Sequence, residues 1–338
     1  MDNICLLIGN GFTIDFIRND RRNKKINLDS SKPLSNFGSE KISYESFIDK
    51  LPLIRDHLIP LSKQLDDDFE AIRLFLEIED FPDEFEERDY QLRRFLALSY
   101  SLLQLELENN IWGNWPWLKW LKKYKENLSC AISFNYDTLL EKYLKLVEYQ
   151  NPYRRIGVFN EGLINSLPII KPHGSMEFDL EENTIEMDEE SAWNSMFFNN
   201  QTYINGEAVV TALSQDKWMF PRLQPDIIPP TQENYNRLKI DWVKYCFDFY
   251  EQHNQRFPIN HFVIVGHSYS ECDRKEINLF IDSLTPGCKF YIVNRTYDEK
   301  IKELIDYIEQ RKHIVVTGPG TEPPKIYLGS LKNELTSV

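Results

Sequence analysis

The sequence predicts an α/β protein: a Rossmann-like, mostly parallel sheet with helices on both faces and an all-helical insertion. Two observations support this prediction. Short apolar runs that are continuous, as in buried parallel strands, alternate with segments of helical periodicity. Four of these runs also end in a small cluster containing Gly, Asn, His or Ser. Because ligands bind beside the carboxyl ends of strands in an open parallel sheet, we interpret the four clusters together as one nucleotide site.

The first strand is expected at residues 3–8, and the turn Gly9-Asn10-Gly11 follows it directly. Such a turn brings backbone N–H groups close to a pyrophosphate. Ile14 stands where the fingerprint of dinucleotide-binding dehydrogenases has its third glycine, so that pattern is not met. A lone Gly-x-Gly is equally typical of a purely structural turn, and that alternative stays open.

The strand pattern is then interrupted by two different segments. Residues 18–39 are polar and contain proline and glycine, which is typical of a mobile loop or lid. Residues 44–126 repeat apolar side chains every three or four positions, which predicts about four helices. The chain therefore divides into a core of residues 1–43 and 127–338 and a helical insertion of residues 44–126.

Prolines and tryptophans mark the inside of the insertion. The prolines expected to separate its helices are Pro52, Pro60 and Pro82. Tryptophans gather around Pro116, at positions Trp112, Trp115, Trp117 and Trp120. Since Trp is enriched in cores and interfaces, we expect a buried plug or a subunit contact rather than a cofactor cage.

The second polar cluster is Asn135-Tyr136-Asp137, which follows the apolar run at 130–134 and precedes a helix expected at 137–148. Either Asn135 or Asp137 can cap the start of that helix. The carboxylate of Asp137 suits the positive end of the helix, and two caps are not needed. Whether Asn135 instead faces a ligand is left open by the spacing.

The third cluster places His173 between Pro172 and Gly174, after the strand expected at 167–170. Proline stiffens the backbone on one side, and glycine leaves space on the other. A histidine held in this way at a strand end is suited to accept a proton from a ligand. A hydrogen-bonded structural histidine is the alternative.

The fourth cluster, Gly266-His267-Ser268, follows the apolar run at 262–265, and Asn294 closes a further run at 289–293. Helices are expected at 234–253, 274–283 and 298–311, and a last strand at 314–317. The acidic segment 181–190 predicts a hairpin or loop.

Two other chemistries remain open. Gly266-x-Ser268 is similar to the nucleophile elbow of α/β-hydrolases, although Ser270 replaces the second glycine. A triad of Ser268, Asp298 or Asp306, and His313 would leave Asn135 and His173 without a role. A metal site is the second alternative, and its ligands would be Asp137, His173, His267 and Asp273. The chain lacks tightly spaced ligand pairs.

Composition narrows the function classes. The formal net charge of −14 argues against a nucleic-acid surface, which needs a basic footprint. The five cysteines are scattered without the spacing of a zinc knuckle, which indicates a reducing compartment without disulfides. No signal peptide is apparent, and no uninterrupted apolar run reaches about 18 residues, so a membrane span is not expected. We therefore expect a cytoplasmic protein.

Taken in order, the four clusters resemble the sirtuin-like family, in its bacterial anti-phage branch. The family's Gly-Ala-Gly loop, Asn-x-Asp, His-Gly and late Gly-x-Ser correspond to the clusters described above. Residues 224–230 resemble the proline-containing segment after His-Gly, and Asn294 resembles the Asn that contacts the adenosine ribose. Gly9-Asn10-Gly11-Phe12 carries Asn where sirtuins carry Ala, and it also resembles the opening of a related abortive-infection family. The Pro-Asp-Phe-Arg element and the four-cysteine zinc module of the deacylases are missing.

The resemblance implies hydrolysis of NAD at the nicotinamide–ribose bond, with NAD as substrate and no metal. Asn135 would position the ribose hydroxyls or the attacking water, and His173 would accept a proton. The residues expected to bind NAD are Gly9, Asn10, Gly11, Phe12, Asp137, Gly174, Gly266, Ser268 and Asn294. Without the zinc module, protein deacylation is not expected.

The resemblance also implies a biological setting. In such systems infection triggers NAD depletion, and assembly or a lid enforces the inactive state. We therefore expect a homo-oligomer and a defence-system partner protein or a phage trigger. A subunit that binds NAD or ADP-ribose and regulates a partner without turnover is the alternative.

Overall fold

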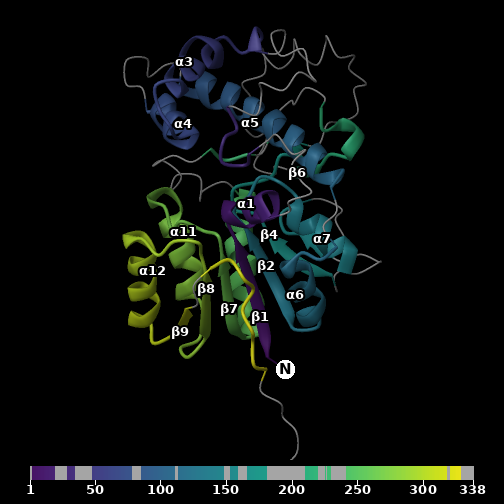
Figure 1. Cartoon of the computed structure of the whole chain (residues 1–338), viewed down its shortest axis with the longest axis vertical. Helices are drawn as coiled ribbons and strands as arrows, with labels where there is room; N and C mark the ends of the chain where they lie inside the picture. The colour runs from purple at the N-terminus through teal and green to yellow at the C-terminus, as the bar shows by residue number, and fades with distance from the viewer. Residues whose placement is uncertain are drawn as a thin grey trace, which may run out of the picture.

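A seven-stranded parallel sheet lies at the centre of the computed structural model (Figure 1). In spatial order its strands are β3 (Tyr153–Arg155), β4 (Leu167–Ile170), β2 (Leu128–Ser133), β1 (Asn3–Ile8), β7 (Ile259–Val265), β8 (Lys289–Val293) and β9 (Ile314–Thr317). The structure describes residues 2–19, 29–34, 48–77, 85–110, 113–147, 153–158, 166–180, 210–219, 225, 227–229, 241–317 and 320–328. The predicted parallel α/β fold is confirmed.

The order of the strands reverses at β1. The first half of the chain adds β2, β4 and β3 on one side of β1, and the second half adds β7, β8 and β9 on the other. In a sheet of this kind, the crevice at the reversal is the usual ligand site. The clusters at Gly9 and Gly266 follow two strands that are hydrogen-bonded neighbours at this point.

Alternate residues of β1 enter two different hydrophobic cores. Ile4, Leu6 and Ile8 pack into one core, and Cys5 and Leu7 into the other. All five side chains are at most 1% exposed, which explains why the strand is apolar throughout rather than alternating. The first core includes α1 (Asn10–Asn19), α6 (Pro116–Tyr124) and α7 (Leu139–Val147), and the second includes α10 (Asp241–Arg256), α11 (Glu271–Asp282) and α12 (Glu299–Gln310). Helices therefore cover both faces, as predicted.

A layer of helices lies beyond the carboxyl edge of the sheet, at the top of Figure 1. It consists of η2 (Ile54–Leu58), α3 (Ile59–Ser62), α4 (Asp68–Leu76) and α5 (Phe85–Glu108). Pro60 does not separate two helices as predicted. It lies in the first turn of α3, and the π-helical η2 runs directly into it. Pro82 and Trp112 lie outside the described residues.

Several predicted bounds change in the structure. Arg18 belongs to α1 rather than to a loop, and of the predicted lid beyond that helix only 29–34 is described. The acidic segment 181–190 lies outside the described residues, and so does the start of the helix predicted at 234–253. A second, antiparallel sheet of β5 (Phe178–Leu180) and β6 (Val210–Ala212) and the 3₁₀ turn η4 (Gln215–Lys217) are additional elements. No helix in the described ranges is both long and apolar enough to cross a membrane.

Three glycines allow the turn after β1 to cross the turn after β7. The Gly9 N–H donates to the Val265 carbonyl over 2.9 Å, and the Gly11 N–H donates to the Gly266 carbonyl over 2.8 Å. A Cβ added to Gly266 would lie 2.5 Å from the Cα of Gly11, and Gly266 has a φ of +58°. The crossing thus depends on missing side chains and on a left-handed backbone conformation.

Gly266→Ala should therefore lower the free energy of unfolding by about 2–5 kcal/mol, the sum of left-handed strain and overpacking. Urea unfolding measures the change. Gly113→Ala is the control, because its added Cβ would meet no atom within 4 Å, and we expect a change below about 0.5 kcal/mol. An equal loss in the two variants would contradict the close crossing.

Candidate functional site

A cavity of about 1260 Å³ lies between the strand ends of the sheet and the helical layer. Its walls come from the segments after β1, β2, β4, β7 and β8 and from α4 and α5. The lining includes these residues proposed from the sequence: Gly9, Asn10, Gly11, Asn135, Asp137, His173, Gly266, Ser268 and Asn294. The fold therefore brings the four polar clusters and Asn294 to one cavity.

Two of the proposed binding residues, Phe12 and Gly174, are not among the lining residues. Phe12 is fully buried and packs against Trp115 and Trp117, with ring centroids 4.8 and 5.7 Å away. Gly174 has a φ of +75°, and its N–H donates to the Lys171 carbonyl over 2.9 Å. Phe12 is thus a core residue, and Gly174 forms a turn that other residues would adopt only with strain.

Two N–H groups of the glycine turn are already hydrogen-bonded within the protein, contrary to the expected role in binding a pyrophosphate. Those of Gly9 and Gly11 are bonded to carbonyls of the β7 turn. These glycines therefore bring two chain segments together. The turn still aims the positive end of α1 at the cavity, because Asn10, at the start of that helix, lines it.

A chain of hydrogen bonds orients the Asn135 amide. Thr13 on α1 donates its hydroxyl proton to Asp137 Oδ2 over 2.8 Å. A hydroxyl has a single proton, so Thr13 Oγ1 acts as the acceptor for Asn135 Nδ2, which lies 3.1 Å away. The amide nitrogen of Asn135 is thereby fixed on the Thr13 side, and Oδ1 is the atom left for another partner.

Asn135 Oδ1 is a buried acceptor without a hydrogen-bond partner in the described part of the chain. The residue is 5% exposed and lines the cavity. Leaving such an atom unpaired costs about 1–3 kcal/mol, which a bound ligand would recover. Asp137 Oδ1 accepts the Leu139 N–H over 3.1 Å at the start of α7, so capping accounts for Asp137 and leaves Asn135 unexplained.

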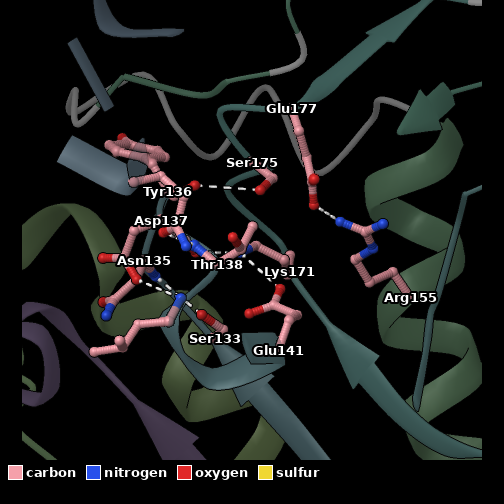
Figure 2. Close-up of polar contacts among 12 residues, drawn as sticks. Ser133, Asn135, Tyr136, Asp137, Thr138, Glu141, Arg155, Lys171, Ser175 and Glu177 are labelled. Atoms are coloured by element: carbon pink, nitrogen blue, oxygen red, sulfur yellow. Dashed lines mark hydrogen bonds and ion pairs between the residues drawn. The ribbon is translucent and has the colours of Figure 1, made fainter. Parts of the chain in front are cut away.

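Figure 2 shows a buried ionic network beside Asn135. Lys171 Nζ donates to the Asp137 carbonyl over 2.8 Å and to Glu141 Oε1 over 3.1 Å. Burial raises the pKa of the Asp137 carboxyl, while Lys171, Thr13 and the Leu139 N–H act in the opposite direction. The network holds the backbone of the Asn135 segment in place through a charged group.

The turn that carries His173 is tied to the same segment (Figure 2). The Tyr136 carbonyl accepts the Ser175 hydroxyl over 3.2 Å and the Met176 N–H over 2.9 Å. Next along the chain, Glu177 forms a buried ion pair with Arg155 on the edge strand. These contacts fix the positions of the β2 and β4 ends relative to each other.

His173 is paired with a carboxylate from the other half of the sheet. Its Nε2 lies 2.6 Å from Oε2 of Glu276 on α11, and the two residues are 4% and 1% exposed. The ring also meets Phe134 edge-on, with centroids 4.9 Å apart and planes at 83°. His173 therefore has a defined ring orientation in the cavity wall.

His267 also faces a carboxylate, but a backbone hydrogen bond determines its tautomer. Nδ1 accepts the Tyr269 N–H over 3.0 Å, so Nε2 carries the ring proton and faces Asp273 Oδ2 at 3.4 Å. Burial lowers the pKa of His267; Asp273 opposes this shift, and His173 adds to it. The neutral form of His267 is thus the stable one near pH 7.

The hydrolase alternative is contradicted by the strand directions. Ser268 follows the carboxyl end of β7, whereas His313 precedes the amino end of β9. In register, Ile314 pairs with Lys289, which pairs with His261 near the start of β7. Ser268 and His313 therefore lie at opposite edges of the sheet and cannot share a proton.

The four-residue metal site is not formed either. Asp137 and His267 are not part of the group of possible ligand atoms that the described residues bring together. His173, Asp273 and Glu276 do place possible ligand atoms within 4.8 Å of one another. The hydrogen bond between His173 and Glu276 is short enough to explain that proximity without an ion.

A thiol in the cavity is unsuited to nucleophilic attack. Cys272 lines the cavity, and burial, followed by the charge of Asp273, raises its pKa to about 12. Since the thiolate is the reactive form, Cys272 stays protonated near pH 7.

Some residues of the site were missed by sequence reasoning. Thr13 carried no signal. Lys171 begins the third polar cluster but was given no role, because it acts through tertiary contacts. Glu276 did carry a signal in the sequence. It stands three residues after Asp273, which places two carboxylates on one face of a helix that follows a strand end. The helical layer contributes further lining residues, namely Asp67, Phe69, Glu70, Arg73 and Tyr100.

Comparison with known proteins adds little. Neither a family model nor a curated protein matches the chain. Among solved structures, one entitled "Structure of Sir2Tm bound to a propionylated peptide" aligns with 91% of this chain and 91% of that chain, at 11% identity and a TM-score of 0.28. A similarity at this level establishes no function for the chain.

The His267 contacts predict a pH dependence of stability. Between its lowered folded-state pKa and the unfolded value of about 6.5, the unfolded chain binds more protons, so the free energy of unfolding falls as the pH drops below about 6.5. His267→Asn keeps an acceptor for the Tyr269 N–H but cannot titrate, so its decline should be shallower. Urea unfolding between about pH 5 and pH 8 measures both curves.

His57→Asn serves as the control for this experiment, because His57 is exposed and outside the cavity. Its curve should follow that of the wild type. Equal slopes in wild type and His267→Asn would show that His267 is not the group that titrates.

Proposed function

We propose that the chain binds NAD in this cavity and hydrolyses the bond between nicotinamide and ribose. The observation that supports it most is the buried, unpaired Oδ1 of Asn135 in the same cavity wall as the His173–Glu276 pair. One group is an acceptor that a hydroxyl or a water would satisfy. The other is a histidine whose carboxylate partner suits it to general base catalysis.

The size of the cavity, and two cations at its β8 end, suit a dinucleotide. Its volume of about 1260 Å³ exceeds the range of about 300–1,000 Å³ usual for small-molecule sites. Arg295 and Lys300 line it beside Asn294, and neither forms an ion pair with a described residue. In a chain with a net charge of −14, these cations favour a pyrophosphate at the β8 end of the cavity.

The proposed reaction begins with loss of nicotinamide. The bond from C1′ of the ribose to nicotinamide breaks, and its electron pair leaves with the neutral base. Positive charge then develops on the ribose, and the Asn135 carbonyl dipole stabilises it or orients the water. The water oxygen bonds to C1′, and His173 takes the proton, which yields ADP-ribose, nicotinamide and a proton.

The same proposal assigns the remaining site residues. Ser268, Asn294 and the start of α1 at Asn10 would hold the phosphates and the adenosine. Asn294 is itself oriented by donating its Nδ2–H to the His267 carbonyl over 2.8 Å. Asp137 would act through Thr13 on Asn135 rather than on NAD.

The biological part of the proposal rests on the sequence resemblance to the anti-phage branch of the sirtuin-like family. We place the activity in the cytoplasm, in line with five free thiols, and expect it to deplete NAD during infection. Homo-oligomerisation and a partner protein or phage trigger would control it. The second candidate function is a subunit that binds NAD or ADP-ribose without turnover, and the Gly9–Gly11 crossing is equally compatible with it.

Asn135→Ala and His173→Ala should each reduce NAD hydrolysis by at least about 100-fold, because each removes a group proposed to act in the transition state. Release of nicotinamide from NAD, measured by chromatography with and without infected-cell lysate, is the assay. Asn260→Ala and His57→Ala are the matched controls, since both residues are exposed and outside the cavity.

Two outcomes would redirect the proposal. Full activity in His173→Ala would remove the assigned base. Calorimetric NAD binding by the wild type without turnover in any condition would favour the regulatory subunit.

Activity that EDTA abolishes and a divalent ion restores would favour a metal-assisted reaction at His173, Asp273 and Glu276. We expect EDTA to leave nicotinamide release unchanged, because the base is proposed to be a carboxylate-paired imidazole. The assay is the same, with dialysed protein without EDTA as the control.

A further inference from the structure

Glu276 is buried beside His173, and its carboxylate needs a hydrogen-bonded partner to carry a charge there. The carboxylate is 1% exposed, and a charge taken so far out of water is stable only when it is paired and hydrogen-bonded. Its Oε2 lies 2.6 Å from His173 Nε2, within the range of charge-assisted hydrogen bonds. Glu276 and His173 come from opposite halves of the sheet, so the pairing is a product of the fold.

This contact defines which ring nitrogen of His173 is basic. An ionised carboxylate only accepts hydrogen bonds, so Nε2 carries the proton that Glu276 accepts. Nδ1 then holds the lone pair. The edge-on contact with Phe134, at 83° between the planes, prevents the ring from turning freely about this bond.

Asp273 cannot take the place of Glu276. Its Oδ1 lies 3.8 Å from His173 Nε2, which is too far for a hydrogen bond. Its Oδ2 accepts the Ser270 hydroxyl over 2.7 Å and faces His267 Nε2 at 3.4 Å. Each of the two carboxylates on α11 therefore serves a different histidine.

We propose that Glu276 is the positioning residue of the reaction, acting through His173; this inference rests on the proposed function. Glu276 holds His173 in the tautomer with Nε2 protonated. When Nδ1 takes the proton of the attacking water, the carboxylate stabilises the imidazolium that forms. The titratable groups that face His173 in the described part of the chain include Glu276 and Asp273 from α11 and His267 from the turn after β7.

Glu276→Gln removes the negative charge of the side chain at position 276 and keeps its shape. Glutamine keeps an oxygen that accepts the Nε2 proton but loses the negative charge. We expect kcat to fall by at least about 100-fold with KM little changed, since the charge matters only once the imidazolium forms. The midpoint of the acidic limb of the pH–rate profile should move to lower pH, because imidazolium is no longer stabilised.

Two further variants separate positioning from folding. Glu276→Asp retains the charge and should recover part of the lost kcat. Glu309→Gln makes the same change at an exposed position on α12 and should behave like wild type. An unchanged pH profile and kcat in Glu276→Gln, with an active wild type, would overturn the role of Glu276 and leave the proposed function standing.

A wild type that does not hydrolyse NAD would contradict the proposed function. The pairing of Glu276 with His173 can still be tested then by a measurement that needs no turnover. Nitrogen-15 NMR of the histidine rings in the full chain reports the tautomer and titration midpoint of His173. Protonated Nε2 in wild type, and a lower midpoint in Glu276→Gln but not in Glu309→Gln, would support the pairing. Protonated Nδ1 or equal midpoints would overturn it.

Discussion

At the carboxyl edge of the sheet, the turn after β1 crosses the turn after β7 at backbone contact distance. Gly11 and Gly266 lie so close that neither has room for a Cβ, and their turns are joined by the hydrogen bonds of the Gly9 and Gly11 N–H groups. This crossing closes the crevice at the point where the strand order reverses. It also places the start of α1, and with it Thr13, beside the ends of β2 and β7. The orientation of Asn135 through Thr13 depends on that placement.

The polar groups of the cavity wall are arranged differently on the two sides of β1. On the β2 and β4 side, Lys171, Asp137 and Thr13 form a continuous network that ends at an unpaired amide oxygen. On the β7 side, two carboxylates from α11 face two histidines. Phe134 packs edge-on against both histidines, with ring centroids 4.9 and 4.8 Å away. Asp273 lies near both imidazoles, but His173 is hydrogen-bonded to Glu276, so the two histidines differ in their nearest carboxylate.

Much of this arrangement was predictable because it depends on local pattern. The continuous apolar runs identified β1, β2, β4, β7, β8 and β9, and the polar residues after four of the strands identified the cavity. The three-residue β3 was missed, since two of its residues are arginines and only pairing with β4 makes it a strand. The direction of the Gly9 and Gly11 N–H groups was also beyond reach, because it is determined by contact with a turn more than 250 residues away. For Glu276 the spacing from Asp273 indicated two carboxylates on one helix face, but the rotation of α11 about its axis decides which of them meets His173.

Within the helical layer, α4 gives the cavity a wall outside the hydrogen bonds that orient Asn135 and His173. On α4, Arg73 is paired with Glu70 and Glu77, so the charges it brings to the cavity are already balanced. The strand ends hold the groups suited to chemistry, while this wall limits the size and shape of what can reach them. The cavity side of α4 is thus separate from the bonds that orient Asn135 and His173. The shape of the cavity and its reactive groups are therefore set by different parts of the fold.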